Sequence, residues 1–364
     1  MVHTLTRLWQ IGLLVGLLAT SASLSAADTS SSGAKAGNAT AKPAHPVRKQ
    51  LDLALRQRKA KRYDEAIATL RQAEGLEKDD DLAAELRFAL AQSYFSKGQA
   101  ALEHRLEGVD GASVMAQSIA VLDDVMTKHP KHERASSAAY LSGSAYLLLG
   151  DLAKGVVAYR KAHGDYPESK LRAKALLRVG VCQSGLDRPK EAVATYRRVV
   201  REFPDSTANV KKARKYLNEQ VLVGKPAPRI PTKDWLYGVV DDGVPQTFSG
   251  QVYVVVFFAT WCTHCSHNVP RLKGVIERWS GQGVAFIGVA NPTDPKNTEP
   301  VDAYIAGNEI AFDDVGLDQG YRSWPGYRVT GLPATVVVDR QGVVRWRGNL
   351  AYLPESLIAT LNAE

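Results

Sequence analysis

The stretch QVYVVVFFATWCTHCSHNVPRL, residues 251–272, contains two of the three cysteines of this 364-residue chain, Cys262 and Cys265. Residues 251–258 form a run that is β-branched or aromatic after Gln251, which is typical of a strand buried on both faces. The residues from Cys265 to about Ser280 predict a helix. The cysteine pair therefore lies where a buried strand passes into a helix.

Four kinds of site can use two cysteines at this spacing. A structural zinc site normally takes four ligands, commonly from two such pairs, and Cys182 is the only other cysteine. Covalent haem attachment needs histidine directly after the second cysteine, where this chain has Ser266. A purely structural disulfide closing so short a loop adds little stability. The pattern therefore favours a redox pair.

The position of the pair also indicates a division of labour. Unpaired N–H groups and the dipole at the helix N-terminus stabilise a thiolate at Cys262. Cys265, one turn further, is expected to be more buried and to resolve a mixed disulfide. His264 is predicted to stabilise the same thiolate, which would make the disulfide more oxidising. The alternative for His264 is a solvent-exposed turn residue without consequence.

A second part of the site is expected at Gly331-Leu332-Pro333-Ala334-Thr335, directly before a strand. Pro333 fits a cis peptide bond opposite the cysteines. The backbone of Leu332 would then be free to pair with an incoming substrate chain.

The rest of the second half alternates strands and helices. Strands are expected at 284–290, 334–340 and 343–348, and helices at about 301–308 and from Glu355 onward. This order predicts an α/β sandwich.

The first half contains a repeat of helical character. The segments 118–130, 155–167 and 192–204 align without gaps, and their terminal prolines are 37 residues apart. Gly143 and Gly180 stand at matching places upstream, where a small residue lets two helices approach closely. An earlier copy is sketched by Ala54, Ala66, Leu70 and Ala73, and a further one begins at Ala91 and Tyr94, interrupted by an insertion around 99–113.

Residues 47–204 resemble tetratricopeptide repeats, helix pairs that recur about every 34 residues. The matching positions are Gly143, Tyr146, Tyr159, Ala162, Pro167, Gly180, Ala192, Tyr196 and Pro204. The resemblance implies a helical solenoid that docks a protein partner, with a spacer as the alternative. Residues 207–221 would form its capping helix. Cys182 is predicted to be a small buried core thiol.

The motifs ATWCTHC, GLPAT and VVVDRQG, with Pro270 in the first helix, make the second half similar to TlpA/ResA-like thiol–disulfide oxidoreductases with a thioredoxin fold. The resemblance implies that Cys262 is the nucleophile, Cys265 the resolving thiol, Trp261 a surface flank and Pro333 the cis-proline. This sequence departs from the expected pattern at two positions. Asn268 and Val256 replace acidic residues that this family or thioredoxins use beside the buried thiol. Thiol peroxidase activity is disfavoured, because Ala259 replaces the threonine it requires.

The N-terminus predicts export. Arg7 precedes the apolar run 11–18, which is shorter than the ~20 residues of a membrane span, and small residues end at Ala27. Cysteines of an exported protein can persist as disulfides.

The net charge is +8, but the segment from residue 222 onward contains 12 basic and 14 acidic residues. The positive excess, +9 over residues 27–221, marks an acidic partner or a solvated helical surface.

We therefore expect a signal peptide at 1–26, a disordered linker at 27–46, a helical repeat domain at 47–221 and a thioredoxin-like domain at 222–364. The predicted protein is an exported oxidoreductase of a bacterial periplasm or envelope, with no cofactor beyond the Cys262–Cys265 disulfide. Its expected partners are protein thiols or disulfides, a redox partner and a protein docked on the repeats, without nucleic acid or a membrane span in the mature form. The alternative is an envelope scaffold with a redox-inert thioredoxin-like domain.

Overall fold

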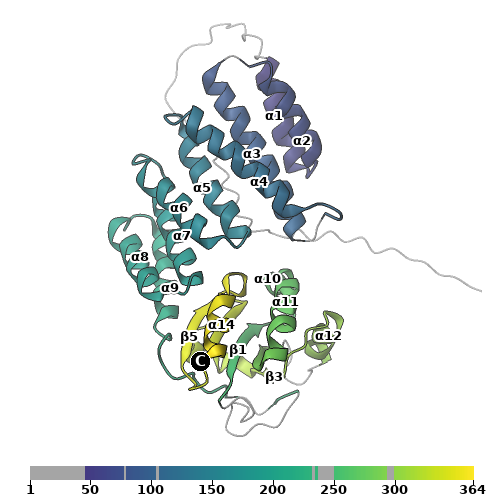
Figure 1. Ribbon diagram of the computed structural model, residues 1–364, viewed down its shortest axis with the longest axis vertical. Coiled ribbons are helices and arrows are strands. Elements are labelled where there is room, and N and C mark those ends of the chain that lie inside the picture. Colours follow the sequence, from purple (N-terminus) through teal and green to yellow (C-terminus); the bar gives the residue numbers. More distant parts are fainter. Residues whose placement is uncertain (1–45, 78, 104–105, 232–233, 237–249, 293–298) are drawn as a thin grey trace, which may run out of the picture. The chain divides into compact units, whose positions relative to one another are not determined.

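The computed structural model describes residues 46–364 except 78, 104–105, 232–233, 237–249 and 293–298. A helical part comes first in the chain, and a part built on a β-sheet follows it (Figure 1). The predicted signal peptide and nearly all of the predicted linker lie outside the described residues; Pro46, its last residue, begins the first helix. Within the described residues, no helix is both long and apolar enough to span a membrane.

The helical part is a succession of antiparallel pairs, as the repeat pattern predicts. Its helices are α1 (Pro46–Lys59), α2 (Tyr63–Glu74), α3 (Asp80–Leu102), α4 (Gly111–Lys128), α5 (Glu133–Leu148), α6 (Leu152–Gly164), α7 (Arg172–Gly185), α8 (Pro189–Glu202) and α9 (Thr207–Gln220). The expected insertion lengthens α3 to 23 residues and α4 to 18 residues.

Each of the last two pairs is held together by a tyrosine ring that lies against a glycine. A Cβ built on Gly143 would lie 2.7 Å from the ring of Tyr159, and one built on Gly180 would lie 2.4 Å from the ring of Tyr196. Both tyrosines are buried. The glycines are therefore needed because no side chain fits between these helices.

A polar contact recurs in the first and last pairs and supports the weaker first copy. Thr69 donates to Gln57 at 3.0 Å, and Thr195 donates to Gln183 at 2.7 Å, twelve residues apart in each case. Both glutamines also donate to a glutamate at the start of the following helix. The shared spacing indicates that α1–α2 and α7–α8 have the same construction.

The sheet part contains, within the described residues, a mixed five-stranded sheet in the order β3-β2-β1-β4-β5. Its strands are β1 (Val252–Phe258), β2 (Val284–Ala290), β3 (Asp314–Leu317), β4 (Ala334–Val338) and β5 (Val344–Gly348). β1, β2 and β3 are parallel, whereas β4 is antiparallel to both β1 and β5. Every residue of the central strand β1 is buried, as its apolar run predicts.

Alternate residues of β1 point into two cores. Val254 and Val256 face the helices α11 (Val269–Trp279), α12 (Glu299–Gly307) and α14 (Glu355–Ala363). Val255 and Phe257 face a second core, which Tyr327 of the short helix α13 (Trp324–Tyr327) helps to close. Leu222 and Ile230, which follow α9 in the chain, belong to this second core. The segment that leaves the repeats is therefore part of the sheet domain's interior.

The structure differs from the sequence predictions in two details. The single helix expected over 265–280 is broken at Asn268 into α10 (Thr263–His267) and α11. Pro270 lies in the first turn of α11 and has no N–H to donate to the preceding turn, so the helix restarts there. The strand β3 was not expected, because DVGL is too short and too polar to show a strand pattern.

Candidate active site

Cys262 and Cys265 form a disulfide that closes the first turn of α10, with their Cα atoms 5.2 Å apart. Cys262 is the N-cap residue, and its Sγ accepts a hydrogen bond from the N–H of Cys265 at 3.1 Å. This is the helix-terminal position that the sequence predicts. The N–H that contacts Sγ would stabilise negative charge on that sulfur once the disulfide is reduced.

The two cysteines do not differ in exposure as expected. Cys262 is 7% exposed and Cys265 is 5% exposed, so the predicted contrast between an accessible and a buried sulfur is slight in this disulfide form. The flanking residues are accessible instead. Trp261 is 55% exposed, and His264 is also exposed. Trp261 therefore occupies the surface flank that the resemblance implies.

The Leu332–Pro333 loop lies beside the cysteines. Its peptide bond is cis, as predicted, and Pro333 immediately precedes β4. Pro333, Cys265, Val256 and Leu350 line a common small cavity with an almost entirely apolar wall. The structure therefore brings together the two segments that the sequence singles out.

The backbone of Leu332 is available for pairing. In the part of the chain that the structure describes, neither its N–H nor its C=O has a hydrogen-bond partner. The neighbouring carbonyl of Pro333 accepts a hydrogen bond from the side chain of Asn349 at 3.3 Å. An extended chain could therefore add to the loop at Leu332.

No carboxylate is found in the described wall of the cavity beside Cys265. Val256 occupies the strand position where thioredoxins have a buried acid, and it is buried. The amide of Asn268 donates to the carbonyl of His264 at 2.7 Å. Val256 and Asn268 therefore leave neither of the two expected acids at these positions of the site.

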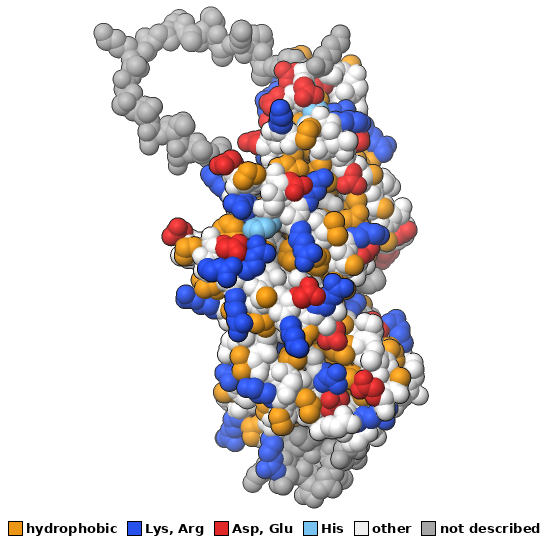
Figure 2. All heavy atoms as spheres, turned by 60° about the vertical axis from the view of Figure 1, so that its left-hand side comes forward, with side chains coloured by type: hydrophobic (Ala, Val, Ile, Leu, Met, Phe, Trp, Pro, Cys, Tyr) orange, Lys and Arg blue, Asp and Glu red, His pale blue; other side chains and the backbone are white. Residues whose placement is uncertain are grey.

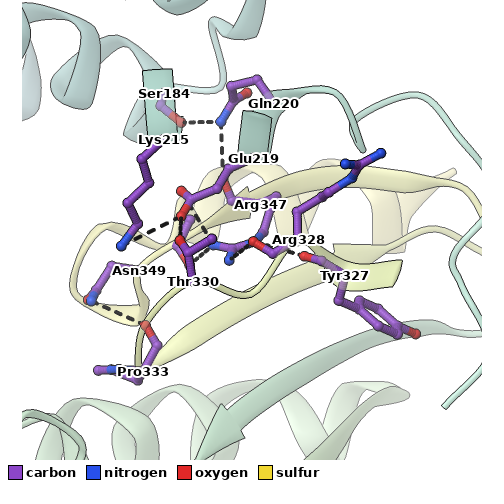
Figure 3. Close-up of polar contacts among 11 residues, drawn as sticks. Ser184, Lys215, Glu219, Gln220, Tyr327, Arg328, Thr330, Pro333, Arg347 and Asn349 are labelled. Carbon is purple, nitrogen blue, oxygen red and sulfur yellow. Dashed lines mark hydrogen bonds and ion pairs between the residues drawn. The ribbon is translucent and has the colours of Figure 1, made fainter. Parts of the chain in front are cut away.

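Helix α9 holds the loop that leads to Pro333. The hydroxyl of Thr330 donates to Glu219 at 3.2 Å, and the other carboxylate oxygen of Glu219 lies 3.6 Å from the guanidinium of Arg347 (Figure 3). The same guanidinium donates to the carbonyls of Tyr327 and Arg328 at 3.3 and 3.1 Å. One buried ion pair therefore connects the end of the repeats to the segment before the cis-proline.

A second set of contacts joins the repeats to β5 and to the short helix η4 (Leu350–Tyr352) that follows it. The indole N–H of Trp346 donates to the carbonyl of Ser184 at 2.9 Å. Gln220 donates both to the hydroxyl of Ser184 and to the carbonyl of Arg347. Tyr352 packs against the apolar cores of the repeats, two residues after Leu350 in the cavity wall.

Sequence reasoning missed the residues of this junction. Glu219 is the one acidic residue in 207–221, among four basic ones, and that isolation was the available signal. Nothing in the sequence indicated that Arg347 is buried. The last strand before a C-terminal helix is expected at the edge of the sheet, where charged side chains normally face water.

The third thiol does not belong to the site. Cys182 lies in a core to which α3, α4, α5, α6 and α7 contribute, and it is fully buried, as predicted. Burial raises the pKa of its thiol to about 12, and the charge of Arg178 opposes this only in part. Among the described residues, no cluster of three or more His, Cys, Asp or Glu side chains could hold a metal ion.

Comparison with known proteins agrees with this architecture. Residues 223–347 match the AhpC/TSA family, and residues 137–169 and 174–206 each match the tetratricopeptide repeat. Protein FixW of Rhizobium leguminosarum is 29% identical over 147 residues, which cover 37% of this chain and 64% of FixW. The thiol-disulfide oxidoreductase ResA of Bacillus thuringiensis subsp. konkukian is 25% identical over 127 residues, which cover 35% of this chain and 69% of ResA.

Among solved structures, the thioredoxin-like superfamily protein SPOA0173 aligns with a TM-score of 0.33 and 23% identity, over 38% of this chain and 97% of that protein. The AhpC/TSA match over residues 223–347 covers the cysteine pair and the strands of the sheet part up to Arg347 in β5. Residues 223–347 are a thioredoxin-like domain of the AhpC/TSA family, related to ResA-type thiol–disulfide oxidoreductases and preceded in the chain by tetratricopeptide repeats.

Proposed function

We propose that this protein is an exported thiol–disulfide oxidoreductase that uses Cys262 and Cys265 as its redox pair. The observation that carries the proposal is the Cys262–Cys265 disulfide at the N-terminus of α10, beside the open backbone of Leu332. The names of relatives such as ResA support the same chemistry.

In the reducing direction, the thiolate of Cys262 attacks one sulfur of a substrate disulfide. A mixed disulfide forms, and the other substrate sulfur leaves as a thiolate that takes up a proton. Cys265 then loses its proton and attacks the sulfur of Cys262, which releases the second substrate thiol and restores the Cys262–Cys265 disulfide. Two electrons pass from the pair to the substrate, and the reverse sequence oxidises a dithiol.

We assign roles to the remaining residues from their positions around the cysteine pair. Leu332 would hold the substrate chain through its backbone, and Pro333 would keep that loop against the cysteines. Trp261 would cover one side of the bound segment, and His264 would favour the thiolate of Cys262. We further propose that residues 1–26 direct export to the periplasm or envelope and that the repeats dock a protein partner.

Disulfide exchange with single-cysteine variants tests the proposal. Wild-type protein with dithiothreitol should reduce insulin, whereas Cys262→Ser should be inactive. Cys182→Ala is the matched control, because it removes a thiol from the buried helical core and should retain the activity. Cys265→Ser should accumulate mixed disulfides that a double Cys262→Ser/Cys265→Ser variant does not form. Equal activity of wild type and Cys262→Ser would rule out the enzyme and leave the scaffold interpretation.

A further inference from the structure

The positive charge of the chain is concentrated in the last repeats. Residues 47–150 contain 15 basic and 15 acidic residues, whereas residues 151–221 contain 16 basic and 8 acidic residues, a net charge of +8. Many Lys and Arg side chains lie on the face shown in Figure 2. This basic segment ends with α9, whose Glu219 accepts a hydrogen bond from Thr330, three residues before Pro333. The basic segment therefore ends beside the candidate active site.

Lys215 is the basic residue of α9 that lies at the substrate loop. A Cβ built on Gly331 would be 3.3 Å from its Nζ, so the ammonium group sits against the residue directly before Leu332. Figure 3 shows the side chain extending from α9 toward the loop that ends at Pro333. The Lys215 side chain is 39% exposed, so an incoming group can contact it.

The nearest carboxylate is already engaged elsewhere. Glu219 lies 3.9 Å from Nζ of Lys215, but it accepts from Thr330 at 3.2 Å and pairs with the buried Arg347 at 3.6 Å. Arg347 is 2% exposed, whereas Lys215 is partly in water. The charge of Glu219 is therefore directed to the buried arginine, and the ammonium of Lys215 retains capacity for a second anion.

Gly331 lets the ammonium of Lys215 approach the loop closely. Its φ is not among the positive values of the described glycines, so its backbone does not require glycine. A side chain at this position would instead crowd Lys215, because its Cβ would lie 3.3 Å from the ammonium nitrogen. With glycine at this position, the ammonium of Lys215 can lie against the loop beside Leu332.

We propose that Lys215 forms part of the substrate-binding surface and selects client segments that carry a carboxylate next to their reactive cysteine. This inference rests on the proposed function. A chain paired with Leu332 lies about 4.8 Å from the loop backbone, so an Asp or Glu side chain on it can reach Nζ of Lys215. The basic face of residues 151–221 attracts an acidic client over longer distances. Helix α9, which follows the last repeat, thereby contributes to substrate choice.

The test uses two disulfide-linked peptide substrates that differ only in Glu or Gln next to the cysteine. Wild-type protein should have a higher kcat/KM for the Glu peptide. Lys215→Gln should lower this value about 3- to 5-fold, as expected for one partly exposed charge pair, and leave the Gln peptide unchanged. Lys215→Glu should reverse the preference, and 1 M salt should abolish it.

Lys212→Gln is the matched control, because it removes the same charge from an exposed position of the same helix. This variant should lower kcat/KM only slightly, and by the same factor for the Glu and the Gln peptide. Equal loss of the Glu preference in the two variants, or no preference in wild type, would overturn the role of Lys215 while leaving the oxidoreductase intact. Failure of wild type to exchange either peptide would instead refute the proposed function, and the inference with it.

Discussion

Glu219 of α9 and Arg347 of β5 form an ion pair that is closed off from solvent, with 6% and 2% of the two residues exposed. Burial lowers the pKa of the Arg347 guanidinium, and the charge of Glu219 acts in the opposite direction. The guanidinium also binds backbone carbonyls of Tyr327, Arg328 and Gly348. The end of the repeats is therefore fixed to the loop before Pro333 by charge as well as by packing.

Removing the negative partner of this pair should destabilise the protein. Glu219→Gln keeps a neutral acceptor but removes the negative charge beside a buried arginine, and we expect the free energy of unfolding to fall by about 3 kcal/mol. Glu202→Gln, which breaks an exposed pair with Arg198, should change it by less than about 1 kcal/mol. Urea denaturation of the three proteins measures the difference, and equal stabilities would show that the buried pair contributes no net energy.

The glycine–tyrosine contacts should tolerate no added methyl group. Gly180→Ala places a Cβ 2.4 Å from the ring of Tyr196, so we expect a loss of about 1–3 kcal/mol from overpacking. Gly164→Ala is the control, since a Cβ there meets no atom within 4 Å. Thermal unfolding should separate the two variants, with Gly164→Ala close to wild type. A wild-type midpoint for Gly180→Ala would contradict the packing described here.

Cys182 should make the protein less stable in alkali. The pKa of its thiol is about 12 in the folded state against a reference value of 9.0, so between these pH values the unfolded chain loses a proton that the folded chain keeps. Stability therefore falls as pH rises from about 9 to 12, by up to roughly 4 kcal/mol from this group.

Substitution isolates that contribution from other groups that titrate in alkali. Cys182→Ala should be less stable than wild type near neutral pH, because it leaves a small cavity, but its stability should decline less steeply above pH 9. Denaturation under reducing conditions across pH 7 to 11 measures both slopes. Parallel curves would mean that the thiol ionises as readily in the folded protein as in the unfolded chain.

An acidic residue near Cys265 should accelerate the step in which this cysteine resolves the mixed disulfide. Asn268 lies three residues after Cys265, and the cavity beside that sulfur has an apolar wall. Asn268→Glu should shorten the lifetime of the mixed disulfide about tenfold or more, because a carboxylate can take the proton of Cys265. Rapid mixing with a chromogenic disulfide measures this lifetime. Asn268→Gln is the control, and an equal effect of both substitutions would exclude proton transfer as the cause.

The sequence predicted the cysteine site and much of the fold because the signals there are local. A strand of β-branched residues, a cysteine pair and a proline before a second strand define both the elements and their junctions. The break at Asn268 could also have been expected from Pro270, whose effect on a helix is local as well.

The junction between the repeats and the sheet could not be predicted in the same way. Glu219 and Arg347 are 128 residues apart, and each lies in a segment whose own pattern indicates an exposed surface. The near-equal burial of Cys262 and Cys265 was missed for a related reason. Residues from several separate segments, Pro333 and Leu350 among them, pack around the pair and determine its access to solvent.

The single-turn helix η4 has an evolutionary consequence. Leu350 lines the cavity beside Cys265, whereas the partly buried Tyr352 packs against the apolar cores of the helical array. Without the helical array, the ring of Tyr352 would lose these apolar contacts and be exposed to water. We therefore expect a homologue that lacks the helical array to carry a polar residue in place of Tyr352.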